Sequence, residues 1–151
     1  MLKGIHPLIT ADLLHALAAM GHGDTIAIVD ANFPAASNAR RLLQVPGAGA
    51  PEVLAAVLEL LPLDTDALPA AVTMAPVDAG EIPEVVADFA AVFTERDLAE
   101  AEIASVPRAA FYARAREAYA VVATGELRPY GNILLVKGVV DTSRENGGLP
   151  R

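Results

Sequence analysis

The chain has 151 residues, a mass of 15.7 kDa, a formal net charge of −8 and a pI near 4.7. This length predicts one domain with its own core and is too short for two domains of ordinary size. With 11 Lys and Arg residues against 19 Asp and Glu, the chain lacks the basic surface that a nucleic-acid partner needs. It also has no cysteine, which excludes disulfides, thiolate metal sites and cysteine nucleophiles and is compatible with a reducing cytoplasm.

Apolar residues are unusually frequent for a domain of this size. They make up 54% of the chain, and the mean hydropathy is +0.40. A small interior holds only part of this apolar surface, so we expect some of it to lie in subunit interfaces of an oligomer. The amino-terminal residues lack the apolar core of a signal peptide, and no run of about 18 apolar residues predicts a membrane span. A cytoplasmic protein is therefore expected.

The first half of the chain predicts alternating helices and strands. Thr10 is the expected N-cap of a helix over residues 11–20, and Gly21 is its expected stop. Residues 25–29 are almost wholly apolar, as in a strand covered on both faces. The next predicted elements are a loop over 31–38, a strand over 41–45, a helix over 51–61 with Pro51 at its first position, and a strand over 70–77.

The second half continues the same alternation. It predicts helices over 83–98 and 107–118, a strand over 119–124, a loop over 125–131 and a strand over 132–139. Strands that alternate with helices predict an α/β fold: a three-layer α/β/α single domain over residues 1–140 with a mixed, largely parallel sheet. Residues 141–151 are predicted to be a frayed, disordered tail.

The first candidate site surrounds a histidine between two glycines. Gly21-His22-Gly23-Asp24 precedes the strand over 25–29, and Asp30 follows that strand directly. The unperturbed pKa of histidine is closer to neutrality than that of any other side chain, and neighbouring glycines allow a ligand to approach closely. Open α/β sheets bind ligands at the carboxyl ends of their strands, where Asp30 is expected. Structural alternatives remain: His22 as a helix-capping loop residue and Asp24 as a turn residue.

Other catalytic chemistries find little support. His15 is expected to be solvated on the polar face of its helix, and His6 to have a structural or interface role. His22, Asp24 and Asp30 form a weak candidate set for a divalent metal, because no second ligand cluster accompanies them.

The sequence lacks the motifs of nucleotide binding and of serine hydrolases. Gly47-Ala48-Gly49 lacks both the third glycine and the preceding strand of a dinucleotide-binding loop. The three serines, Ser37, Ser105 and Ser143, do not lie in a nucleophile elbow. Acid–base chemistry with hydrogen-bonding groups is what remains.

The second candidate site lies late in the chain. Arg108 begins a predicted helix, where its charge opposes the helix dipole, so it is either an incidental surface residue or a ligand contact. Tyr130 and Asn132 flank Gly131 in the loop between the last two predicted strands. A phenol and a carboxamide so close together suit the hydroxyl groups of a sugar, although a simple turn would use the same residues.

Taken together, these motifs resemble the L-fucose mutarotase and D-ribose pyranase family over nearly the whole chain. The matching segments are Gly21-His22-Gly23-Asp24, Asp30 to Ala35, Arg108 with Phe111-Tyr112, Thr124-Gly125-Glu126, and Tyr130-Gly131-Asn132-Ile133. The fucose-type branch fits better: ribose-type members usually carry threonine in place of Gly23, Gly-Leu-Pro in place of Asn32-Phe33-Pro34, and alanine in place of Gly131. Residues 39–104 follow the family only loosely, so the reaction is better supported than the exact sugar.

The resemblance implies an isomerase that interconverts the α and β anomers of a free monosaccharide, most simply L-fucose, without metal or organic cofactor. By this resemblance His22 is the general acid/base. Our hypothesis for the mechanism is that Asp30 or Tyr130 supplies the complementary proton transfer through a hydroxyl or a water. Asp30, Arg108, Tyr130 and Asn132 would hold the sugar, with the Gly131 backbone alongside. It further implies ring-shaped homo-oligomers, often two stacked rings, with a decamer as one expected assembly and active sites near subunit boundaries.

Three alternatives stay open at this point. A D-ribose pyranase would exchange pyranose and furanose forms with the same groups. A non-catalytic protein would bind a monosaccharide in the same pocket. A metal-dependent hydrolase would use His22, Asp24 and Asp30.

Overall fold

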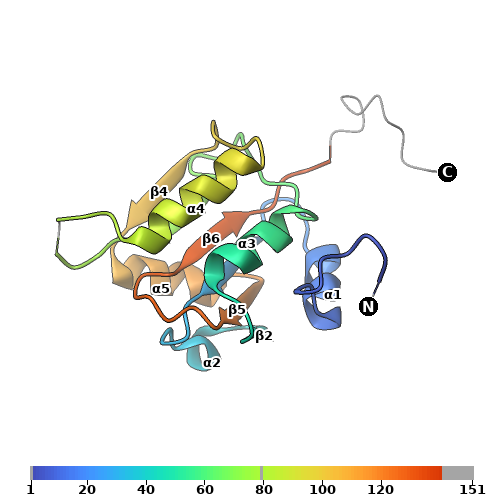
Figure 1. Ribbon diagram of the computed structural model, residues 1–151, viewed down its shortest axis with the longest axis horizontal. Helices are drawn as coiled ribbons and strands as arrows, with labels where there is room; N and C mark the ends of the chain where they lie inside the picture. Colours follow the sequence, from blue (N-terminus) through green and yellow to red (C-terminus); the bar gives the residue numbers. More distant parts are fainter. Residues whose placement is uncertain (1, 79, 141–151) are drawn as a thin grey trace.

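The computed structural model describes residues 2–78 and 80–140 (Figure 1). These residues form five helices, α1 (Ala11–Ala19), α2 (Ala35–Asn38), α3 (Ala50–Leu58), α4 (Glu84–Glu95) and α5 (Arg108–Glu117). They form six strands, β1 (Thr25–Val29), β2 (Leu42–Val45), β3 (Ala71–Met74), β4 (Ile103–Val106), β5 (Ala120–Thr124) and β6 (Ile133–Val136). None of the described helices is long and apolar enough to cross a membrane. The predicted tail over 141–151 lies outside the described residues.

All six strands join one mixed sheet in the order β2-β5-β1-β6-β3-β4. The pairs β1–β5, β2–β5 and β3–β4 are parallel, and β6 runs antiparallel between β1 and β3. In this register Ile28 lies opposite Ile133, and Thr25 lies opposite Val136. The start of β6 therefore meets the carboxyl end of β1, and the end of β6 meets the beginning of β1.

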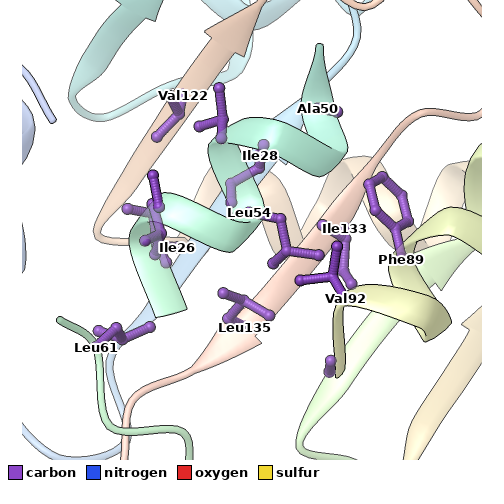
Figure 2. Packing of buried hydrophobic residues seen from close by; sticks show 14 of the residues in the cluster. Ile26, Ile28, Ala50, Leu54, Leu61, Phe89, Val92, Val122, Ile133 and Leu135 are labelled. Atoms are coloured by element: carbon purple, nitrogen blue, oxygen red, sulfur yellow. The ribbon is translucent and has the colours of Figure 1, made fainter. Parts of the chain in front are cut away.

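Helices cover both faces of the sheet, as the three-layer prediction requires. In Figure 1, α3 and α4 lie in front of the sheet and α5 lies behind it. Residues of β1 alternate between two apolar clusters: Ile26 and Ile28 pack with α1, α3 and α4, whereas Ala27 and Val29 pack with α2 and α5. Figure 2 shows Leu54 of α3 and Phe89 of α4 packed over β6. Each fully buried side chain of this size stabilises the fold by about 1.5–3 kcal/mol.

Two elements were not predicted from the sequence. Strand β4 has only four residues at the edge of the sheet and is only partly buried, so it leaves no continuous apolar run. Helix α2 is a single turn within the predicted loop over 31–38. The strand predicted over 70–77 ends at Met74, two residues before Pro76, which has no N–H to continue a ladder.

The amino-terminal cap of α1 agrees with the sequence prediction, whereas its carboxyl end does not. The N–H of Leu13 donates to Thr10 Oγ1 at 3.2 Å. Gly21 is not the helix stop: Met20 already leaves the helix in an extended conformation. In its place, the ammonium group of Lys137 donates to the carbonyl oxygens of Leu17 at 2.8 Å and Met20 at 2.6 Å. A cation at this end also complements the helix dipole.

We expect Lys137→Met to lower the free energy of unfolding by about 1–3 kcal/mol, because two charge-assisted hydrogen bonds to carbonyl groups are lost. Urea unfolding at a fixed protein concentration measures the effect. Lys3→Met is the matched control, since Lys3 is exposed and makes none of these contacts. Equal unfolding midpoints for the two variants would contradict the capping role.

Candidate functional site

One edge of the sheet brings together residues far apart in the sequence. Asp30 follows β1 and is only 5% exposed, and Asn132 immediately precedes β6. The backbone N–H of Asp30 donates to Asn132 Oδ1 at 3.0 Å, and Asn132 Nδ2 donates to Asp30 Oδ2 at 2.8 Å. The antiparallel register of β1 and β6 thus makes a reciprocal pair from residues 102 positions apart.

The second carboxylate oxygen of Asp30 stabilises the turn that follows β1. Asp30 Oδ1 accepts a hydrogen bond from the backbone N–H of Asn32 at 3.0 Å, which is the Asx-turn pattern of a short acidic side chain. The buried carboxylate thus has Asn132 and the Asn32 backbone as partners. An ionised carboxylate has lone pairs beyond these two bonds, so Asp30 is held in place and still able to accept from a hydroxyl group.

Tyr130 and Gly131 shape the loop before β6. Tyr130 has a positive φ of 65°, which is uncommon for a residue with a side chain and marks a conformation imposed by its surroundings. Its hydroxyl oxygen accepts from the N–H of Val77 at 3.3 Å. A Cβ on Gly131 would come within 2.6 Å of Glu126 Cγ, so a side chain there would force Glu126 to shift. The loop is therefore close-packed and presents a half-buried phenol.

Arg108 also lies at this edge of the sheet. It is the first residue of α5, two positions after β4 ends, and its side chain is exposed. Within residues 2–78 and 80–140 its guanidinium group forms no hydrogen bond or ion pair. Of the predicted sugar-holding residues, the sheet thus gathers Asp30, Tyr130, Gly131 and Asn132 in contact, with Arg108 at the end of a parallel strand.

His22 lies at the opposite edge. It precedes β1, its side chain is 62% exposed, and its Nε2 is 3.0 Å from Asp64 Oδ2. The side chain of Asp64 is 19% exposed, and its other oxygen accepts from the N–H groups of Asp66 and Ala67 at 3.2 Å. The imidazole is therefore accessible, and its partner carboxylate is held by its own turn.

Backbone hydrogen bonds from the end of β6 hold both sides of this pair. Lys137 accepts from Gly23 N–H and donates its own N–H to the carbonyl of Asp24, both at 2.8 Å. Asp64 N–H donates to the carbonyl of Val136 at 2.9 Å. The Asp24 carboxylate accepts from Gly21 N–H at 2.7 Å, which confirms the turn role considered for Asp24.

The two groups of residues are separated by the length of β1. Its five residues span about 13 Å, with His22 beyond one end and Asp30 beyond the other. A single chain therefore does not bring His22 to Asp30, Tyr130 or Asn132. The candidate metal set of His22, Asp24 and Asp30 is wrong for the same reason, and the described residues contain no group of three His, Cys, Asp or Glu side chains placed to bind a metal.

A charged pair next to the Tyr130 loop was given no role from the sequence. Glu126 is 6% exposed, and its carboxylate accepts from Arg128 Nε at 2.9 Å and Nη2 at 3.0 Å. These hydrogen bonds lower the pKa of Glu126 to about 2 against the opposing effect of burial. The same contacts raise the pKa of Arg128 above its ordinary value.

The remaining site predictions have mixed outcomes. His15 is exposed, as expected, and His6 is half-buried with its Nδ1 accepting from Leu8 N–H at 3.2 Å. Asp64 carried no sequence signal, because its partner is 42 positions away. Glu126 and Arg128 did carry a sequence signal, because they are an acid and a base two positions apart inside a candidate loop. Only the fold shows that Glu126 is buried.

A cavity of about 650 Å³ lies beside β3, β4 and α4. Its lining is mainly apolar and includes Val86, Ile103 and Ile82. None of the predicted site residues lines it. The polar edge with Asp30 and Asn132 is thus separate from this cavity.

The comparisons with known proteins agree with the resemblance found in the sequence. Residues 3–140 match the model of the RbsD / FucU transport protein family. The chain is 42% identical to a human fucose mutarotase over 146 residues, which cover 92% of this chain and 94% of that protein.

Solved structures show the same fold. The fucose mutarotase from Streptococcus pneumoniae, in complex with L-fucose, has a TM-score of 0.86 and 41% identity and covers 93% of this chain and 100% of its own. The Bacillus subtilis RbsD complexed with D-ribose has a TM-score of 0.74 and 26% identity with the same coverage. The fold, the family model and the identity over nearly the whole chain show that this protein belongs to the RbsD / FucU family.

Proposed function

We propose that this protein is a sugar mutarotase that interconverts the α and β anomers of L-fucose. The observation that carries the proposal is the 41–42% identity to fucose mutarotases over more than 90% of the chain, against 26% to RbsD. The site chemistry supports it, because mutarotation needs little beyond acid–base groups and hydrogen bonds. A cytoplasmic location, expected from the composition, is part of the same proposal.

Mutarotation opens a cyclic hemiacetal to the aldehyde and closes the ring on the other face. Opening removes the proton of the anomeric hydroxyl and delivers a proton to the ring oxygen as the bond between that oxygen and C1 breaks. Closing reverses both transfers after rotation about the C1–C2 bond. Positioned acid–base groups accelerate such steps by about 10²–10⁴-fold.

His22 is the proposed proton carrier, and Asp64 is the residue that orients it. The carboxylate of Asp64 is a hydrogen-bond acceptor at 3.0 Å from Nε2, so the neutral imidazole carries its proton on Nε2. Nδ1 is then the free acceptor of the ring. An accessible imidazole with one nitrogen fixed can take a proton from a sugar hydroxyl and return it to the ring oxygen.

Asp30, Arg108, Tyr130 and Asn132 are proposed to hold the sugar, with the Gly131 backbone beside it. Their edge offers carboxylate and carboxamide acceptors, a phenol that can donate or accept, and a guanidinium donor, which together fit the alternating hydroxyls of a monosaccharide. Arg108 is a binding group and not a proton shuttle, because a guanidinium group stays protonated. Tyr130 or Asp30 is the proposed partner of His22 in proton transfer.

The separation of His22 from these residues implies a site shared by two subunits. One subunit would contribute the edge with Asp30 and Asn132, and its neighbour would contribute His22 with Asp64. Large apolar side chains remain exposed on a single subunit, among them Leu42, Leu68, Val77, Ile82 and Leu127, and exposed apolar surface of this kind favours association. We therefore propose a ring-shaped homo-oligomer, of which a decamer of two stacked rings is one form.

We expect His22→Ala to reduce anomer exchange by about 100-fold or more, because the proton carrier is lost, while folding is unchanged at this exposed position. Saturation-transfer NMR between the anomeric protons of L-fucose measures the rate. Asp64→Asn is expected to cost about tenfold through loss of the orienting carboxylate. His15→Ala is the control, because His15 is also an exposed histidine. Equal exchange rates in His22→Ala and His15→Ala would contradict the proposed role of His22.

Running the same NMR measurement with D-ribose separates the alternatives. A D-ribose pyranase would exchange pyranose and furanose forms faster than it exchanges the anomers of L-fucose. A non-catalytic binding protein would bind L-fucose and leave the exchange at the buffer rate. Either result would contradict the proposed L-fucose mutarotase.

Co-expression of two inactive variants tests the shared site. His22→Ala and Arg108→Ala each remove one half of every site, so either variant alone is expected to be inactive. In randomly mixed rings about one quarter of the sites regain both intact residues, and about one quarter of the wild-type rate should return. No recovery in mixed oligomers, with both chains present in equal amounts, would show that each site lies within one subunit.

A further inference from the structure

Three charged residues connect the loop between β5 and β6 to two helices. This loop covers residues 125–132 and is called the sugar-binding loop below. Arg128 forms two hydrogen bonds with the carboxylate of Glu126, at 2.9 and 3.0 Å, and Nη1 donates to Asp88 Oδ2 of α4 at 2.7 Å. The backbone N–H of Arg128 donates to the same carboxylate at 3.0 Å. We call Glu126, Arg128 and Asp88 the charged brace.

The inner end of the brace lies against the start of α3. A Cβ on Gly49, the N-cap of α3, would be 3.1 Å from Glu126 Oε2, and the backbone of Ala50 helps to hold the pKa of this carboxyl below its ordinary value. A carboxylate at a helix N-terminus is stabilised by the unpaired N–H groups and by the helix dipole. Since α3 and α4 pack on the same face of the sheet, the brace is fixed to one rigid layer.

Glu126 and Arg128 also contact the residues next to Asp30 and Asn132. The carbonyl of Glu126 accepts from Ala31 N–H at 2.9 Å, directly after Asp30. Gly131 lies against Glu126 Cγ and the carbonyl of Arg128, directly before Asn132. Tyr130 adopts its positive φ between these contacts. A shift of Glu126 would therefore move the residues that flank the proposed sugar contacts.

From these contacts we propose that Glu126 and Arg128 are positioning residues for the sugar-binding loop, with Asp88 as their anchor on α4. They act through Tyr130, Gly131 and Asn132 and do not touch the sugar themselves. This inference rests on the proposed function. Its physical basis is the burial of Glu126: without Arg128 the carboxylate loses its main donors, and a buried unpaired charge must turn toward solvent, which displaces the loop that encloses it.

The Glu126–Arg128 pair is expected to stay ionised throughout the working pH range. The pKa of Glu126 lies at about 2, so protonation would weaken the pair only as the pH falls from about 4.5 toward 2. Between about pH 5 and pH 8, where histidine titrates, the pairing is constant. Loss of the brace should therefore lower activity by the same factor across this range and leave the shape of the pH profile unchanged.

Arg128→Met tests the proposal in the full-length oligomer by anomer-exchange NMR at varied L-fucose concentration. We expect kcat/KM to fall by about 10- to 100-fold, because a binding group displaced by about 1 Å is costly. Most of the loss should appear in KM, since the displaced residues hold the sugar. Arg128→Lys should recover part of it, because lysine keeps the charge but not the two-pronged contact. Asp88→Asn, at a half-exposed position, should raise KM a few-fold without a folding defect.

Arg96→Met is the matched control. Arg96 follows α4 and pairs with Glu59 at 2.7 Å, after α3, so it is a second charged link beside these helices. Its removal should leave kcat/KM within about twofold of wild type, as for most surface ion pairs. Equal KM values for Arg128→Met, Asp88→Asn and Arg96→Met would overturn the proposal, and so would an altered pH profile shape in Arg128→Met.

Hydrogen–deuterium exchange gives a readout that does not depend on activity. The peptide over residues 125–133 should exchange faster in Arg128→Met than in wild type, and the peptide over residues 21–31 should change only at its Ala31 end, where the N–H of Ala31 donates to the carbonyl of Glu126. Should the wild type show no anomer exchange, the proposed function fails while this measurement still reports on the brace. Unchanged exchange over 125–133 would refute the positioning role.

Discussion

The antiparallel pairing of β6 with β1 and β3 is the constraint on which both halves of the candidate site depend. Five strands of the sheet run in one direction, and β6 alone runs against them. Its first end places Asn132 against Asp30, and its other end places Lys137 against the turn that holds His22. One strand thus fixes two polar groups at opposite edges, and a change in its register would disturb both.

These two groups differ in their physics. The Asp30–Asn132 pair is buried and reciprocally bonded, which makes it rigid and directional. In the His22–Asp64 pair the imidazole is largely exposed while its carboxylate partner is mostly covered, which leaves the imidazole accessible for proton exchange. A mutarotase needs both properties, a fixed set of sugar contacts and a mobile proton. The length of β1 keeps them apart in one subunit, so assembly of subunits becomes part of the proposed active site.

Lys137 and Arg128 each connect several segments of this acidic chain. Lys137 closes α1 with its ammonium group and holds the Gly23–Asp24 turn with its backbone. Arg128 joins the loop before β6 to Glu126 and Asp88. Among the described residues, every buried side-chain nitrogen or oxygen has a hydrogen-bond partner, as expected of a well-packed native interior. The unused hydrogen-bonding capacity of the described residues therefore lies in accessible groups such as Arg108 and not in unpartnered buried atoms.

Local patterns determined much of the fold. Apolar periodicity and capping residues such as Thr10 predicted five of the six strands, four of the five described helices and the layered α/β class. These features are local, because the buried face of a strand or helix requires apolar residues at a fixed spacing in the sequence. Strand β4, with four partly buried residues at a sheet edge, left too little of this signal.

The sequence also nominated His22, Asp30, Arg108, Tyr130 and Asn132 as site residues. What only the tertiary structure decided is which of them meet: Asp30 with Asn132, and His22 with Asp64 instead of Asp30. The physical reason is that strand order and direction depend on contacts between residues far apart in the chain. Residue spacing within one segment carries no record of such contacts.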